Sequence, residues 1–261
     1  PAGLAIFTAL GFLIARLIWT ADASRILSLA VALTATEWLR GHILSGFPWN
    51  ALGYALSSPI ALAQTASLIG LWGMTFLAVA IFASPATLID DKSATARAWL
   101  APAIAVIALA IMGVYGTFRL MSEPTRLVES VKLRIMQPNL PQDTKFNYGA
   151  RAEVMRKYLA LSDRSTGPQS SGVRDATVLI WPESAFPFFL AREADAMAQV
   201  ANLLPQGTIL ITGAVRPPDS APPGEPVTRA YNSIYVIDHD GTILSVYDKL
   251  HLVPFGEFLP F

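Results

Sequence analysis

Four long apolar stretches fill the first 120 residues of the chain. Each has roughly the 17–25 residues that an α-helix needs to cross about 30 Å of hydrocarbon, and charged residues are sparse within them. A soluble helical core is the alternative, but core helices of this length usually carry a polar stripe. We therefore predict a membrane domain of about four spans over residues 1–120, with the spans at Ala2–Trp19, Ile26–Leu44, Ser67–Ile89 and Trp99–Phe118.

The composition of the whole chain agrees with a lipid environment. Of its 261 residues, 53% are hydrophobic and only 15% are charged, and the mean hydropathy is +0.45. A soluble domain has fewer apolar and more charged residues. The net charge is zero, which argues against nucleic acid as a partner, because a nucleic-acid-binding protein needs a basic surface. Cysteine is absent, which excludes disulfides, thiolate metal ligands and a cysteine nucleophile within these residues.

The charges in the short loops predict how the helices are oriented. Arg16 and Arg25 flank the turn after the first apolar stretch, and Lys92 and Arg97 lie between the third and the fourth. Short cytoplasmic loops carry an excess of Lys and Arg, so the Lys92 loop is predicted to be cytoplasmic. The polar half of the chain, which follows Phe118, is therefore predicted to lie on the opposite side of the membrane.

The loop at residues 45–66 has no Lys or Arg. Trp49 and Tyr54 are amphipathic aromatic residues of the kind that settle at the lipid headgroup level, while Pro48 and Gly53 interrupt any continuous helix. We interpret this loop either as a structural loop at the membrane interface or as a wall beside which lipid enters an active site. The two interpretations are compatible.

The second half of the chain alternates strand and helix patterns. Short apolar, β-branched runs predict strands, and two segments with helical spacing predict helices. The sequence D-H-D-G between the last two strands is a hairpin signal. This order predicts an α/β layered domain with a mixed sheet over residues 121–261. The predicted strands are Val131–Gln137, Ala176–Trp181, Thr208–Val215, Tyr231–Ile237 and Thr242–Tyr247, and the predicted helices are Ala150–Ser162 and Ala191–Leu204.

Two charged residues come directly after predicted strands. Glu183 follows the strand that ends at Trp181, and Lys249 follows the strand that ends at Tyr247. Catalytic groups of α/β sheets collect at the carboxyl ends of strands. The aromatic neighbours of Glu183 predict a poorly solvated carboxylate, with a pKa raised toward the range useful for a general base. An ammonium within reach would hold that carboxylate ionised and would stabilise an oxyanion on a bound carbonyl.

Less specific roles stay open for these residues. Glu183 can be a carboxylate that merely meets a helix dipole. Lys249 can be a solvated lysine, and its neighbour Asp248 is expected to be solvated. We interpret His251 as a hydrogen-bonded structural group rather than a proton carrier. Glu257 is expected to be a buried carboxylate that pairs with Lys249.

Several motifs, taken in order, carry a resemblance to a known family. W-P-E-S-A-F-P, L-I-T-G-A, Y-N-S-I and K-L-H-L-V-P-F-G-E-F-L-P together resemble the nitrilase superfamily, whose members use a Glu–Lys–Cys triad. G-F-P-W-N-x-L-G-Y in the apolar half, followed by M-Q-P-N-L-P-Q-x-x-K-F, narrows the resemblance to the apolipoprotein N-acyltransferase family. The resemblance covers almost the whole chain.

The resemblance implies a monomeric enzyme of the bacterial cytoplasmic membrane, with an αββα sandwich on the periplasmic side. Such an enzyme moves an acyl chain from a phospholipid to the N-terminal amine of a diacylglyceryl-cysteine lipoprotein, through a thioester acyl-enzyme and without a metal or nucleotide cofactor. Glu183 matches the family's general base, Lys249 its oxyanion-stabilising lysine and Glu257 the further glutamate near that lysine. The candidate substrate-binding residues are Phe146, Trp49, Tyr54 and Asn232.

The family's nucleophilic cysteine lies after the region that matches Phe261. Both domains are therefore expected to be incomplete in this chain, and this fragment is expected to be inactive by itself. Two other classes stay open: a membrane-tethered nitrilase-like amidase and a non-catalytic membrane binding module. The amidase differs in forming its thioester from a soluble amide rather than a phospholipid. A cysteine after a buried strand beyond Phe261 would favour an enzyme over the binding module.

Overall fold

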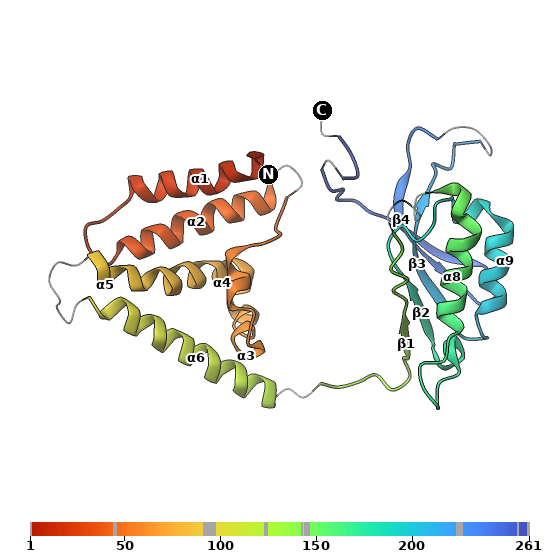
Figure 1. Cartoon of the computed structure of the whole chain (residues 1–261), viewed down its shortest axis with the longest axis horizontal. Coiled ribbons are helices and arrows are strands. Elements are labelled where there is room, and N and C mark those ends of the chain that lie inside the picture. Colours follow the sequence, from red (N-terminus) through yellow and green to blue (C-terminus); the bar gives the residue numbers. More distant parts are fainter. Residues whose placement is uncertain are drawn as a thin grey trace. The chain divides into compact units, whose positions relative to one another are not determined.

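The computed structural model describes residues 2–43, 46–90, 98–122, 125–141, 143, 147–222, 227–254 and 256–259. The chain forms two compact units (Figure 1). One is helical and comprises Pro1–Arg126 together with Leu252–Phe261, and the other is an α/β unit that comprises Leu127–His251. The predicted domain bounds, residues 1–120 and 121–261, stay a prediction.

The helical unit forms from the predicted apolar stretches. Its main helices are α1 (Ala2–Leu17), α2 (Arg25–His42), α4 (Ala66–Ala83) and α6 (Leu100–Ser122), and its shorter ones are η1 (Leu52–Leu56), α3 (Ile60–Ala63), η2 (Ser84–Ala86) and α5 (Thr87–Asp90). Two segments of the described chain, Ala66–Ile89 and Leu100–Ser122, are long and apolar enough to cross a membrane. Helix α1 has 16 residues, and the interior of α2 carries Glu37 and Arg40. A membrane domain of four spans therefore stays a prediction.

Charged side chains are buried inside this unit, while large apolar ones cover its surface. Glu37 and Arg40 are buried, and Arg40 Nη2 donates a hydrogen bond to Glu37 Oε2 at 2.9 Å. Along α6 the side chains of Ile107, Ile111 and Val114 are exposed. Water disfavours such an apolar surface, whereas lipid does not.

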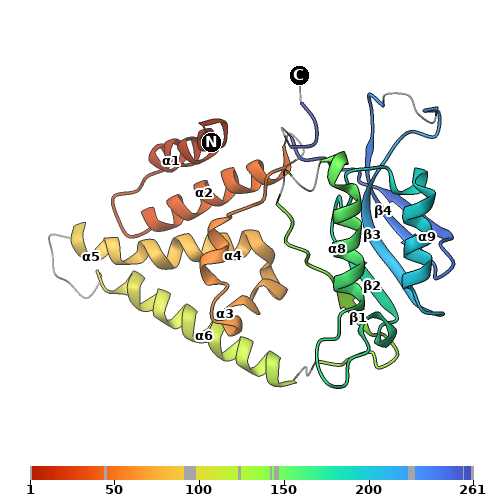
Figure 2. The same cartoon turned by 45° about the vertical axis from the view of Figure 1, so that its right-hand side comes forward.

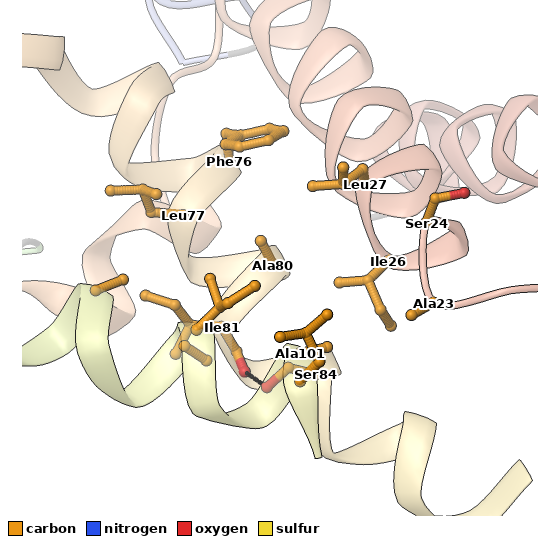
Figure 3. Close-up of a pocket in the computed structure, with 14 residues that line it drawn as sticks. Ala23, Ser24, Ile26, Leu27, Phe76, Leu77, Ala80, Ile81, Ser84 and Ala101 are labelled. Carbon is orange, nitrogen blue, oxygen red and sulfur yellow. Dashed lines mark hydrogen bonds between the residues drawn. The ribbon is translucent and has the colours of Figure 1, made fainter. Parts of the chain in front are cut away.

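A hollow of about 320 Å³ lies between α2, α4 and α6 (Figure 3). Phe76 and Ala80 of α4 face Leu27 and Ile26 of α2 across it, and Ala101 of α6 lies at one side. The lining is apolar almost throughout, so the hollow belongs to the packing of the helices rather than to a polar site.

The loop that contains Trp49 and Tyr54 is held against the helices by close backbone contacts. The Gly53 N–H donates to Thr75 Oγ1 of α4 at 3.2 Å, and a Cβ on Gly53 would come within 2.8 Å of the Leu71 carbonyl oxygen. On α6, a Cβ at Gly116 would overlap the backbone of Ala61 in α3. Glycine at these two positions lets the loop lie directly on the helix surface.

The α/β unit contains one five-stranded mixed sheet, as predicted. The strand order is β1 (Leu133–Ile135), β2 (Val178–Trp181), β3 (Ile209–Arg216), β4 (Tyr231–Ile237) and β5 (Ile243–Asp248). The first three strands are parallel, and β4 and β5 continue antiparallel through the predicted hairpin. The unit's helices are α8 (Arg151–Asp163), α9 (Ala194–Leu203) and the short η3 (Tyr148–Ala150), η4 (Gly172–Asp175) and η5 (Leu190–Arg192).

Helices α8 and α9 cover one face of this sheet (Figure 2). Alternate strand residues such as Leu179, Trp181 and Leu210 point to that face and pack against Tyr158 of α8 and Val200 of α9. The opposite face is largely apolar too, but Ile135, Ile234 and Tyr247 on it are exposed. The described residues of this unit thus form one sheet and one helical layer. An αββα sandwich needs a further sheet and a further layer, so it stays a prediction.

Candidate active site

The candidate site lies at one edge of the sheet, which we call the carboxyl edge: the edge where β2, β3 and β5 end and β4 begins. Glu183 follows the end of β2, Asn232 is the second residue of β4, and Lys249 follows the end of β5. Strand pairing aligns these three ends, so residues far apart in the sequence become neighbours.

The three side chains meet at one oxygen atom. Lys249 Nζ lies 3.4 Å from Glu183 Oε1, and Asn232 Nδ2 donates a hydrogen bond to the same oxygen at 2.5 Å. The Lys249 N–H also donates to the Asn232 carbonyl at 2.8 Å, which continues the pairing of β4 with β5 by one residue. The structure therefore brings Glu183 and Lys249 together, as their places after two strands predicted. Their catalytic roles stay predictions.

A hollow of about 430 Å³ opens beside this cluster, on the sheet face that α8 and α9 leave open. Its floor is apolar and its polar groups gather at the carboxyl edge, a pattern typical of sites that hold an apolar ligand by one polar end. The lining residues are Ile180, Trp181, Glu183, Ile211, Gly213, Asn232, Ser233, Ile234, Tyr247 and Lys249.

The prediction of a poorly solvated Glu183 is wrong for this chain. The Glu183 side chain is 64% exposed, and that of Lys249 is 34% exposed. The aromatic neighbours Trp181, Phe186 and Phe188 are buried in the core beside Tyr158, on the α8 side of the sheet. The Glu183 carboxylate points to the opposite face of the sheet, which α8 and α9 do not cover, so those rings do not desolvate it.

Asp248 is ion-paired, not solvated as predicted. Its carboxylate accepts hydrogen bonds from Arg216 Nε at 3.0 Å and Nη2 at 2.6 Å, and from Ser233 Oγ at 2.6 Å. The Arg216 guanidinium, followed by the Ser233 hydroxyl, holds the pKa of Asp248 below its usual value, and Asp248 raises the pKa of Arg216. The pair joins the ends of β3 and β5 across β4, and thereby fixes the backbone that carries Lys249.

Alternation along β5 is the signal that could have found this pair. Asp248 and Lys249 are adjacent, so their side chains point to opposite faces of the sheet. If Lys249 faces the open side, Asp248 faces the helical layer, where a carboxylate needs a partner. Arg216 at the end of β3 is at the same edge.

The remaining predicted residues lie away from this cluster or outside the described chain. Glu257 is exposed rather than buried, and its Oε2 accepts a hydrogen bond from the Val253 N–H at 2.7 Å. Its pairing with Lys249 stays a prediction. His251 is exposed. Trp49 and Tyr54, at 63% and 51% exposed, belong to the helical unit, and their role in substrate binding is likewise untested.

Phe146 lies outside the described residues, as do Lys92 and Arg97, on which the predicted orientation depends. Within the described part of the chain, no group of three or more His, Asp or Glu side chains is placed to hold a metal ion.

Comparisons with known proteins match both halves of the chain. Residues 1–84 match the family model described as the apolipoprotein N-acyltransferase N-terminal domain, and residues 133–261 match the model for carbon-nitrogen hydrolase. The chain is 70% identical to a protein of Rhodopseudomonas palustris, 71% to one of Bradyrhizobium diazoefficiens and 42% to one of Sinorhizobium fredii, each named apolipoprotein N-acyltransferase. Each comparison covers 100% of this chain and 48% of the relative. The chain thus spans about half the length of the curated relatives it matches.

Proposed function

The chain belongs to the apolipoprotein N-acyltransferase family, and from that premise we propose that it acts in transferring an acyl chain from a phospholipid to the N-terminal amine of a diacylglyceryl-cysteine lipoprotein. The observation that carries this proposal is the meeting of Glu183, Asn232 and Lys249 at the carboxyl edge. A carboxylate that can act as a general base and an ammonium that can stabilise an oxyanion suit acyl transfer to and from a thiol.

In the first half of the proposed reaction, Glu183 accepts the proton of the family's cysteine thiol, which is not among these 261 residues. The thiolate attacks the ester carbonyl of the phospholipid, and Lys249 stabilises the oxyanion that forms. The C–O bond to the glycerol then breaks. The lysophospholipid leaves with the proton held by Glu183, and the acyl chain stays on sulfur as a thioester.

In the second half, the lipoprotein amine attacks the thioester carbonyl, and the C–S bond breaks. Glu183 takes the proton from the amine and returns it to the departing thiolate, so the site regains its starting state. Asn232 holds the carboxylate toward Lys249 through its 2.5 Å hydrogen bond and keeps it directed at the reacting atoms.

The apolar hollow suits the acyl chain of the donor. Ile180, Ile211 and Ile234 line it next to the polar cluster. An acyl chain laid over these residues would exclude water from Glu183, which is exposed in this structure. We propose that this cover, rather than Trp181 or Phe186, raises the basicity of the carboxylate during catalysis.

The helical unit is proposed to anchor the protein in the membrane that holds both lipid substrates. We propose that its apolar helices cross the bacterial cytoplasmic membrane, that the α/β unit lies on the periplasmic side, and that Trp49 and Tyr54 sit at headgroup height. The exposed apolar side chains of α6 support a lipid environment.

The experiment uses the enzyme at its full natural length, reconstituted in phospholipid vesicles with a diacylated lipopeptide. Mass spectrometry is expected to find the enzyme acylated by phospholipid before the lipopeptide is added, and the lipopeptide acylated afterwards. Glu183→Gln is expected to slow formation of the acyl-enzyme by about 10²–10⁴-fold. Its thermal midpoint should be unchanged, because the side chain is exposed.

Glu153→Gln, on the exposed first turn of α8, is the matched control and is expected to retain activity. A thioester formed from a soluble amide but not from phospholipid would instead identify a membrane-tethered amidase. The match to the carbon-nitrogen hydrolase model favours this second candidate. If neither donor forms a thioester, the non-catalytic membrane binding module is the interpretation that remains.

A further inference from the structure

Gly213 of β3 lies directly beneath the turn that carries Glu183. A Cβ at this position would come within 2.5 Å of Glu183 Cα, 2.8 Å of Ser184 N and 2.9 Å of the Pro182 carbonyl oxygen. All three atoms belong to the backbone, so no side chain can rotate away to make room. Glycine is therefore the residue that this contact requires.

The turn is fixed to Gly213 from both sides. The Gly213 N–H donates to the Pro182 carbonyl at 3.2 Å, and the Ala185 N–H donates to the Gly213 carbonyl at 2.9 Å. Between these bonds Ser184 adopts a positive φ of 47°, which non-glycine residues seldom do. The turn from Pro182 to Ala185 is thus held against one residue of β3, and Glu183 is at the point of closest approach.

This contact determines where the Glu183 carboxylate can reach. Strand β3 lies between β2, after which Glu183 comes, and β4, which carries Asn232. To meet Asn232 Nδ2 and Lys249 Nζ, the carboxylate must extend over β3 from a backbone that lies directly on it. A side chain at residue 213 would lift or shift that backbone and would move Oε1 away from both partners.

We propose that Gly213 is a positioning residue, whose missing side chain sets the height of Glu183 above the sheet and so its alignment with Lys249. Its effect on rate rests on the function proposed above, and acts entirely through Glu183. A misplacement of about 1 Å in a catalytic group is enough to lower a rate roughly 100-fold.

The test compares Gly213→Ala with Gly167→Ala in the full-length enzyme. Gly167 lies in the same unit, and a Cβ at Gly167 would meet no atom within 4 Å, so the same methyl group is added there without a clash. Gly213→Ala is expected to lower kcat for acyl-enzyme formation about 10–100-fold. The KM for the phospholipid should stay within about twofold, and Gly167→Ala should match the wild type.

Glu183→Ala and the double variant Glu183→Ala/Gly213→Ala separate positioning from general damage to the fold. If Gly213 acts through Glu183, the double variant is no slower than Glu183→Ala, because the group being positioned is already absent. The proposal would be overturned if the rate loss of the double variant equalled the product of the two single losses. It would also be overturned if Gly213→Ala kept the wild-type kcat. Wild-type enzyme that forms no thioester from phospholipid would instead overturn the proposed function.

Discussion

The two units of the chain place their charged side chains differently. The helical unit buries Glu37 with Arg40 and exposes apolar residues such as Ile111. The α/β unit buries Tyr158 and Phe186 beneath its helical layer and places its charged groups at an exposed sheet edge. Figure 1 shows how different the two scaffolds are, one of helices alone and one of a sheet with helices.

This contrast indicates which surroundings each unit is built for. Water drives apolar side chains into the interior and leaves few of them on the surface. Charged residues move inward and pair with one another where the surroundings are hydrocarbon. The buried Glu37–Arg40 pair and the exposed apolar side chains of α6 fit the second pattern, and the covered face of the α/β unit fits the first.

Arg40→Leu is expected to have the largest effect on stability. It leaves the Glu37 carboxylate buried without the guanidinium that now bonds it at 2.9 Å. Removing one partner of a buried ion pair costs about 3–5 kcal/mol. Denaturant unfolding in detergent micelles would measure the loss. The double variant Glu37→Leu/Arg40→Leu should recover most of the lost unfolding free energy. If the double variant were as unstable as Arg40→Leu, the cost would not come from an unpaired Glu37.

Ile111→Arg tests directly whether α6 faces lipid. Ile111 is 64% exposed near the middle of α6, and an arginine there should disfavour membrane insertion by roughly 3–4 kcal/mol. Leu244→Arg, at a position 55% exposed in the α/β unit, should change stability by less than about 0.5 kcal/mol. The inserted fraction of a glycosylation reporter would measure the first. Normal membrane insertion of the Ile111→Arg variant would contradict the inference that the exposed face of α6 lies in lipid.

Asp248→Asn should weaken the α/β unit by about 1–2 kcal/mol, because it removes charge-assisted hydrogen bonds from Arg216. The pKa of Asp248 is lowered, so its contribution is complete above the usual value of 3.8 and is lost as pH falls through the lowered value. Unfolding free energies measured from neutral to acidic pH should therefore converge for wild type and variant at the acidic end. Glu129→Gln, at an exposed carboxylate, is the control. A deficit that stays constant with pH would contradict this.

The smallest effect is expected at the β4–β5 turn. Asp238 Oδ1 lies 2.8 Å from His239 Nδ1, and this contact raises the pKa of His239 above 6.5. Its stabilisation is therefore complete below pH 6.5 and fades as pH rises through the raised value. NMR titration of Asp238→Asn should show the His239 pKa falling back toward 6.5. Asp240→Asn, in the same turn, should lower it less.

Local patterns predicted the elements of the α/β unit well. The β-branched runs and the D-H-D-G turn depend on neighbouring residues alone, and the mixed sheet and hairpin are confirmed. The meeting of Glu183 and Lys249 was predictable because the ends of strands align in a sheet.

The sequence did not show toward which face of the sheet each side chain near the site points. Trp181, Phe186 and Phe188 surround Glu183 in the sequence, yet these rings are buried in the core, while the Glu183 carboxylate points to the open face and meets Lys249. The pairing of Asp248 and the fit of Gly213 under the turn depend in the same way on which face a residue occupies and on contacts between separate strands. Phe146, a predicted substrate-binding residue, lies outside the described residues.

The glycine contacts of the helical unit have a consequence for membrane recognition. Because Gly53 and Gly116 let their loop lie against α4 and α6, Trp49 and Tyr54 stand on a preassembled platform. In the role proposed above for Trp49 and Tyr54, that backbone would lose little conformational entropy on contact with lipid headgroups. A larger residue at either glycine would clash with the backbone packed against it, and is therefore expected to detach this loop from the helices and to leave Trp49 and Tyr54 without a fixed support.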